Sequence, residues 1–206
     1  YEPDALELPA TWNEPIESQH PVIQHLRWAW RNDVPPPETT VRCALASYYA
    51  LVSSLDAQIG RLLDAIDTSP LRENTIVFYT SDHGEMAGDH GILGKTVMYE
   101  ESVRVPLLLR APMLSGEPRH IGGNLSHIDL VPTLLELMGE AIPDSLQGES
   151  RVPVLRGDQE LTGNDIFIEW SGADGHPPRS LGEAEVNRSM AQPLRTVVSA
   201  QRWKLN

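Results

Sequence analysis

The 206-residue sequence has one cysteine, few basic residues and no long apolar segment. Because Cys43 is its only cysteine, the chain can form no internal disulfide and no cysteine metal site. No run of about 18 apolar residues is present, so no segment is expected to span a membrane. The 16 Lys and Arg residues are outnumbered by 29 Asp and Glu, and the net charge of −13 argues against nucleic-acid binding. An anionic substrate would have to be attracted by a local group of positive charges.

The sequence begins at Tyr1 rather than at a methionine, and no signal peptide is visible. We therefore expect it to be a segment of a longer protein. Its 206 residues and 40% hydrophobic content are sufficient for one domain, or for one domain with a small appendage.

A short apolar segment ends in a group of polar residues. Residues 75–80 are mainly β-branched and aromatic, which predicts a strand buried on both faces, as in a parallel sheet. Asp82, His83 and Gly84 follow, at the end of the strand where ligands of open α/β sheets usually bind. A carboxylate and an imidazole are both common metal ligands. An isolated Asp-His-Gly would fit a surface turn equally well.

The residues that follow form a loop rich in glycine. This loop contains Gly88, Gly91 and Gly94 and ends at Lys95. A further apolar segment, from Val105 to Leu109, predicts a second buried strand.

Residues 75–110 as a whole resemble the sulfatase family of the alkaline phosphatase superfamily. The family pattern is a strand, then S-D-H-G or S-D-N-G, then G-D-H-G or G-E-H-G, a lysine, and Y-E-E-x-x-R-V-P-L. This sequence matches the pattern almost without interruption. The resemblance implies an α/β fold, an α/β/α sandwich with a mostly parallel central sheet. It further implies that residues 1–158 belong to the catalytic domain and that residues 159–206 begin a small C-terminal α+β subdomain.

The resemblance also implies roles for three side chains. Asp82 and His83 would bind a divalent cation, with Ca²⁺ the first expectation and Mn²⁺ or Mg²⁺ as alternatives. Lys95 would contact the sulfate. Because Ca²⁺ prefers six to eight oxygen ligands, Asp82 and His83 alone would not complete its site.

The activity implied by the resemblance is hydrolysis of a sulfate ester, carried by a small molecule or a sulfated glycan. In sulfatases a formylglycine nucleophile and further carboxylate ligands come from the N-terminal half, and the sequence around Cys43 does not match the C-x-P-S-R signature of that nucleophile. We therefore expect the 206-residue chain alone to be inactive. Two alternatives stay open: a phosphonate or phosphate ester hydrolase of the same superfamily, and a noncatalytic metal-binding module.

Hydrophobic periodicity predicts a long helix before the first strand. Apolar residues recur at three- and four-residue spacing from about residue 39 to about residue 67. We expect Thr39 or Thr40 to cap this helix and Cys43 to lie in the core.

A second helix is predicted from His127 to Gly139, with Asp129 as its N-cap and Gly139 at its end. Further strands are predicted at residues 165–170 and 194–204, separated by a long loop at 171–192. Residues 1–37 are expected to be irregular but ordered, with four aromatic or imidazole side chains covering the edge of a core: His20, His25, Trp28 and Trp30.

Overall fold

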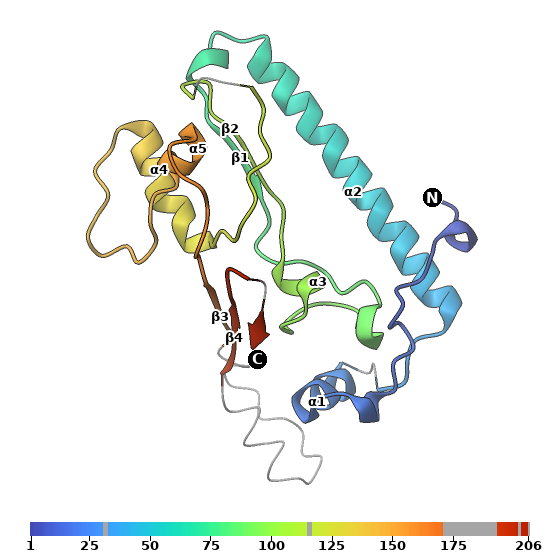
Figure 1. Ribbon diagram of the computed structural model, residues 1–206. Helices are drawn as coiled ribbons and strands as arrows, with labels where there is room; N and C mark the ends of the chain where they lie inside the picture. Colours follow the sequence, from blue (N-terminus) through green and yellow to red (C-terminus); the bar gives the residue numbers. More distant parts are fainter. Residues whose placement is uncertain (31–32, 115–116, 171–192, 202, 206) are drawn as a thin grey trace. The chain divides into compact units, whose positions relative to one another are not determined.

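The computed structural model describes residues 1–30, 33–114, 117–170, 193–201 and 203–205 (Figure 1). The α-helices are α1 (Pro21–Ala29), α2 (Glu38–Asp67), α3 (Glu100–Val103), α4 (Leu130–Met138) and α5 (Val152–Arg156). The strands are β1 (Val77–Thr80), β2 (Leu107–Arg110), β3 (Ile166–Trp170), β4 (Leu194–Val198) and β5 (Lys204–Leu205). Strand β1 pairs with β2, and β3, β4 and β5 form a second sheet in that order. In the described residues no helix is both long and apolar enough to cross a membrane.

The chain divides into two compact units. Unit 1 comprises Tyr1–Ala65, Tyr79–Leu107 and Trp170–Leu194, and unit 2 comprises Ile66–Phe78, Leu108–Glu169 and Arg195–Asn206. The predicted domain limit at residue 158 stays a prediction.

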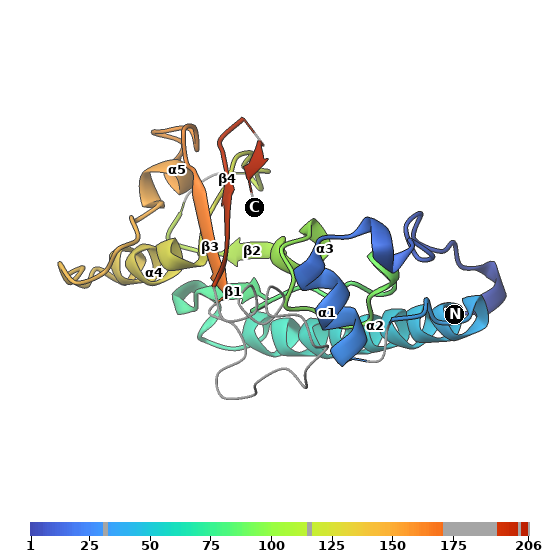
Figure 2. The same cartoon turned by 90° about the horizontal axis from the view of Figure 1, so that it is seen from below.

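The core of unit 1 is built by α1 and the segment that follows β1. Three residues of α1 pack against three residues of that segment: Val22, Ile23, Leu26, Met86, Ile92 and Val97. In Figures 1 and 2 the blue α1 accordingly lies beside the green segment around the 3-10 helix η4 (Asp89–Gly91). The packing places α1 directly against the part of the chain that ends at Lys95.

Helix α1 corrects the prediction that the first 37 residues are irregular. Pro21 occupies its first turn, where the missing N–H is not needed. The His20 side chain accepts a hydrogen bond from Val22 N at 3.3 Å. His25 is buried as expected, whereas Trp28 is 38% exposed.

Helix α2 spans the predicted residues, but its N-cap and the extent of its buried face differ from the prediction. It begins at Glu38, so Thr39 and Thr40 lie inside its first turn and neither is the N-cap. Pro37 O accepts hydrogen bonds from Thr40 N and Val41 N at 2.8 and 3.1 Å. Cys43 is exposed, so its assignment to the core is wrong.

The apolar stripe of α2 is buried only near its N-terminal end. Cys43 is exposed because it lies two residues from both Val41 and Leu45, on the other side of the helix. The buried residues of the helix are Val41, Leu45 and Ala46. Further along, Leu51 is 69% exposed and Leu62 is 59% exposed. Periodicity identified the apolar face correctly, but the described residues cover little of it.

Strands β1 and β2 are shorter than predicted and less buried. The four residues of β1 are all half-buried rather than fully enclosed. In β2, Leu108 is 65% exposed, which contradicts the prediction of a buried strand. Strand β2 begins after Pro106, which has no N–H to donate to a neighbouring strand.

Unit 2 contains α4 and α5. Helix α4 ends at Gly139, whose φ of 76° is the left-handed conformation that glycine adopts without steric cost. Asp129 occupies the N-cap position of α4, as predicted, but its side chain makes no capping hydrogen bond. Its buried side chain instead accepts hydrogen bonds from Glu149 N at 3.0 Å and Arg151 Nε at 2.9 Å, and it thereby holds the segment before α5.

The C-terminal segment forms a hairpin rather than one strand. Strand β4 pairs with β5 in antiparallel register, with Val197 opposite Leu205. Ser199 N donates to Trp203 O at 2.8 Å across the turn. Strand β3 matches the predicted strand at 165–170, and the predicted loop at 171–192 lies outside the described residues.

Candidate active site

Asp82 and His83 lie just beyond the last residue of β1, as the sequence predicts. Their side chains are 84% and 43% exposed, respectively. Both residues belong to unit 1, as does Lys95, which is also exposed. All three side chains are therefore accessible to a ligand.

A hydrogen bond to the backbone orients the His83 ring. Its Nδ1 lies 2.8 Å from Gly84 O, and a carbonyl oxygen can only accept a hydrogen bond. In the neutral ring Nδ1 therefore carries the proton and Nε2 carries the lone pair, as in the usual arrangement of metal-binding histidines. Nε2 lies 3.6 Å from Asp82 Oδ2. These two potential metal-ligand atoms therefore face one another at a separation that suits ligands of one cation.

The Asp82 carboxylate is held in its ionised form. The hydrogen bond from His83 N to Asp82 Oδ1, 3.0 Å long, lowers the pKa of Asp82, and the nearby His83 ring lowers it further. An ionised carboxylate is the hard oxygen donor that Ca²⁺, Mg²⁺ and Mn²⁺ prefer.

Gly84 fixes the backbone that directly follows Asp82 and His83. Its N–H donates to Ser102 O at 2.7 Å. A Cβ at this position would lie 1.9 Å from Glu101 O, so no other residue fits without movement of the backbone. The absence of a side chain at Gly84 thus allows the segment after Asp82 and His83 to pack against α3.

The loop leading to Lys95 is closed by its own backbone and is strained. Met86 N donates to Gly94 O at 2.8 Å, and Gly88 N donates to Ile92 O at 2.9 Å. Among the described residues, the non-glycine positions with positive φ are Ala87, His90 and Thr96, at 50°, 53° and 72°. All three lie in or next to this loop, and such strain is concentrated at functional sites.

A second set of contacts holds the loop against the N-terminal segment. His90 Nδ1 lies 2.6 Å from Glu14 Oε2, and the His90 ring stacks on Tyr99 with centroids 3.9 Å apart. Thr11 hydrogen-bonds the Asp89 carboxylate and accepts from His90 N at 2.8 Å. No sequence pattern indicates Glu14 or Thr11, because more than 70 residues separate them from their partners.

The described residues contain no group of three or more His, Cys, Asp or Glu side chains arranged to hold a metal. Asp82 and His83 offer two ligands, against the six to eight that Ca²⁺ prefers. A complete calcium site would need carboxylates from other residues or from a longer chain.

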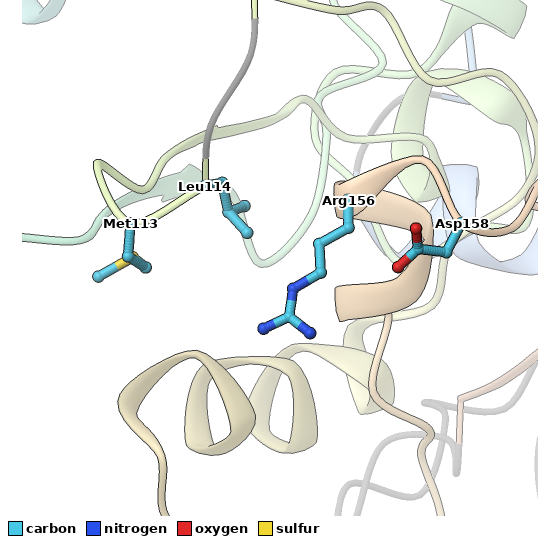
Figure 3. Close-up of a pocket in the computed structure, with 4 residues that line it drawn as sticks. All are labelled: Met113, Leu114, Arg156 and Asp158. Carbon is cyan, nitrogen blue, oxygen red and sulfur yellow. The ribbon is translucent and has the colours of Figure 1, made fainter.

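Unit 2 contains a separate hollow of about 270 Å³, lined by Met113, Leu114, Arg156 and Asp158 (Figure 3). The Arg156 guanidinium extends into the space in front of Met113 and Leu114. None of the predicted site residues lines this hollow, and its lining contains no pair of metal ligands comparable to Asp82 and His83.

Comparison with known proteins identifies the family to which the chain is similar. The family model described as Sulfatase matches residues 12–140, which include β1, the loop and Lys95. Arylsulfatase K from Canis lupus familiaris is 32% identical over 180 residues, 87% of this chain and 32% of the relative. The uncharacterized sulfatase YidJ from Escherichia coli is 44% identical over 108 residues, 52% of this chain and 21% of the relative. The chain thus spans about a third or less of the length of these curated relatives.

Two solved structures share the fold. A phosphonate monoester hydrolase from Silicibacter pomeroyi has a TM-score of 0.83 and 27% identity, and the match covers 100% of this chain and 42% of that chain. BT4656, solved in complex with its substrate D-glucosamine-2-N,6-O-disulfate, has a TM-score of 0.61 and 25% identity over 86% of this chain and 35% of that chain. Because the family model covers more than half of the sequence, the chain belongs to the sulfatase family.

Proposed function

We propose that this chain is part of a longer sulfatase that hydrolyses a sulfate ester at the site carrying Asp82, His83 and Lys95. The observation that carries the proposal is the convergence of His83 Nε2 and Asp82 Oδ2, 3.6 Å apart, at the end of β1. The membership of the sulfatase family supports it independently.

Asp82 and His83 would hold one divalent cation together with carboxylates from outside this chain. Such a cation neutralises charge on the sulfate oxygens and orients the ester. The ionised Asp82 and the Nε2 lone pair of His83 fit Ca²⁺, Mn²⁺ or Mg²⁺, and the further carboxylate ligands expected from the rest of the protein would favour Ca²⁺. The nucleophile would be a formylglycine contributed by the rest of the longer protein.

Lys95 would bind a nonbridging oxygen of the sulfate through its ammonium group. An ammonium is a compact positive charge with three donors, which suits an anionic group whose charge changes during the reaction. This local charge matters because the chain as a whole carries −13 and repels anions. The sulfated glucosamine bound by BT4656 supports a sulfate ester, of a small molecule or a sulfated glycan, as the substrate class.

Hydrolysis of a phosphonate monoester is a second candidate. The similarity to the phosphonate monoester hydrolase, with a TM-score of 0.83, favours it. Both ester groups present anionic oxygens to a cation and a lysine, so the described residues serve either reaction. Comparing kcat/KM for an aryl sulfate and for the matching aryl phosphonate monoester in the full-length protein distinguishes the two.

The test of the metal site is elemental analysis of the full-length protein alongside kcat/KM for an aryl sulfate. Asp82→Asn should lower both metal occupancy and kcat/KM, the latter by about tenfold or more, because it removes a charged ligand. Asp56→Asn, an exposed position on α2, is the matched control and should change neither. Full metal content with unchanged activity in Asp82→Asn would refute the proposal.

Changing the second ligand identifies the metal class. His83→Asn replaces imidazole by an amide oxygen, which Ca²⁺ accepts readily, so the loss should be mild if the metal is Ca²⁺. The same substitution should cause a larger loss if the metal is Mn²⁺, which binds imidazole well.

A further inference from the structure

We infer that Glu85 is a positioning residue that fixes the backbone next to Lys95. Glu85 follows the Asp82-His83-Gly84 segment directly, and its carboxylate reaches across the loop that those residues open. The inference rests on the role proposed for Lys95. The inference assigns a function to the Glu85 carboxylate, which has no part in the proposed mechanism.

The contact lies at the residue before Lys95. Glu85 Oε1 accepts a hydrogen bond from Gly94 N at 2.6 Å and a second, longer one from Ala87 N at 3.3 Å. Hydrogen bonds to a carboxylate are about twice as strong as those between neutral groups. The half-buried Glu85 side chain therefore links Ala87 and Gly94, at the two ends of the loop, to the segment that carries Asp82 and His83.

The rest of the loop explains why the hydrogen bond from Gly94 N to Glu85 is needed. Its backbone bonds join Met86 to Gly94 and Gly88 to Ile92, so they end one residue before Lys95. On the other side, Thr96 has a φ of 72°, a conformation that β-branched residues strongly disfavour. Without the bond from Gly94 N to Glu85, the residues around Lys95 could relax toward ordinary conformations and move its ammonium group.

Glu85 is close in sequence to Asp82 and could be considered a third metal ligand. Its Oε1 already accepts two backbone N–H groups, however, and these bonds direct the carboxylate into the loop. The metal content of Glu85 variants should therefore equal that of the wild-type protein.

A double-mutant cycle tests the inference in the full-length protein, with kcat/KM for an aryl sulfate as the readout. Glu85→Ala should lower kcat/KM by about tenfold when Lys95 is present, because small displacements of a group that binds the reacting atoms are costly. In the Lys95→Ala background the same change should cost less than about twofold, because there is no ammonium left to position. Glu7→Ala, an exposed carboxylate of unit 1, is the control and should have no effect in either background.

Two conservative variants separate the hydrogen bond from the charge. Glu85→Gln keeps an acceptor oxygen at the same reach, whereas Glu85→Asp keeps the charge but withdraws the oxygen by one methylene. We expect Glu85→Gln to be the more active of the two. Higher activity in Glu85→Asp would overturn the inference, because charge rather than the bond to Gly94 N would then matter.

The cycle also separates this inference from the proposed function. Equal losses for Glu85→Ala in both backgrounds, with a large effect of Lys95→Ala, would reject positioning by Glu85 and leave the role of Lys95 intact. A loss of less than about threefold for Lys95→Ala would reject the role of Lys95, and positioning by Glu85 with it. Reduced metal content in Glu85→Gln would contradict the inference and identify Glu85 as part of the metal site.

Discussion

Lys95 is the residue whose assignment matters most for the chemistry. It is exposed, it lies in a strained loop, and it is one of two lysines in the chain, the other being Lys204. Its alternative role is that of an ordinary solvated lysine.

We predict that Lys95→Ala lowers kcat/KM of the full-length protein for a sulfate ester by on the order of a hundredfold, as expected for the loss of a charge that stabilises the transition state. Steady-state kinetics measure this effect. Lys204→Ala, on β5, is the control and should leave kcat/KM near the wild-type value. A change of less than about threefold in Lys95→Ala would favour the solvated role, since exposed charges contribute little.

Glu14 gives the loop a stability that depends on pH. Burial acts to raise the pKa of Glu14, but hydrogen bonds with His90, Gln19 and Ser18 outweigh it and lower the pKa below its ordinary value. A carboxylate whose pKa falls on folding stabilises the folded state above its unfolded pKa. This contribution is lost as the pH falls through the folded pKa.

We therefore predict that Glu14→Gln lowers the Tm at neutral pH and that its Tm approaches that of the wild-type protein in acid, once the pH has fallen through the lowered pKa of Glu14. Thermal unfolding of the full-length protein between about pH 3 and pH 7 tests this prediction, with Glu7→Gln as the control. A Tm difference that increases in acid would have the wrong sign for the mechanism.

The segment from Gly84 to Lys95 acts as one structural element, and Gly84 is where it meets α3. An added Cβ would lie 1.9 Å from Glu101 O, a backbone atom that cannot move by itself. Gly60, in the middle of α2, has no heavy atom within 4 Å of the same added Cβ. The two glycines form a matched pair, one in close contact and one in open space.

Gly84→Ala should destabilise the protein by about 1–3 kcal/mol, the usual cost of forcing extra volume into a packed region. It should also reduce metal occupancy, because the clash lies next to His83. Gly60→Ala should instead stabilise the protein by about 0.5–1 kcal/mol, since alanine favours a helix interior. Denaturant unfolding together with elemental analysis measures both effects, and equal free energies of unfolding for the two variants would contradict the packing argument.

For the molecule as a whole, we propose that this chain contributes only part of an active site. The proposed cation would receive two ligands from Asp82 and His83, and the sequence around Cys43 does not match the formylglycine signature. The apolar face of α2, including Leu51 and Leu62, is largely exposed in the described residues. A longer protein that supplies the nucleophile would also supply apolar surface to cover this face of α2.

We predict that the purified 206-residue chain does not turn over an aryl sulfate, whereas the full-length protein does. Both are assayed at equal concentration with added Ca²⁺ or Mn²⁺. Turnover by the short chain that disappears in its Asp82→Ala variant would show that the chain contains a complete site.

The sequence by itself determined the features whose causes are local. The length of α2 follows from a helical repeat within one segment, the end of α4 follows from Gly139, and β1 with its polar end follows from a short apolar run. The positions of Asp82, His83 and Lys95 could be predicted for the same reason, because the motif that contains them is continuous along the chain.

Only the tertiary structure decided which distant groups meet. It revealed α1 as a helix packed on the loop, Glu14 as the partner of His90, and the side chain of Asp129 as the acceptor for the segment before α5. It also placed Cys43 on an exposed face. Periodicity predicts which face of an element is apolar, but the residue that covers that face or satisfies a buried carboxylate can lie anywhere in the chain.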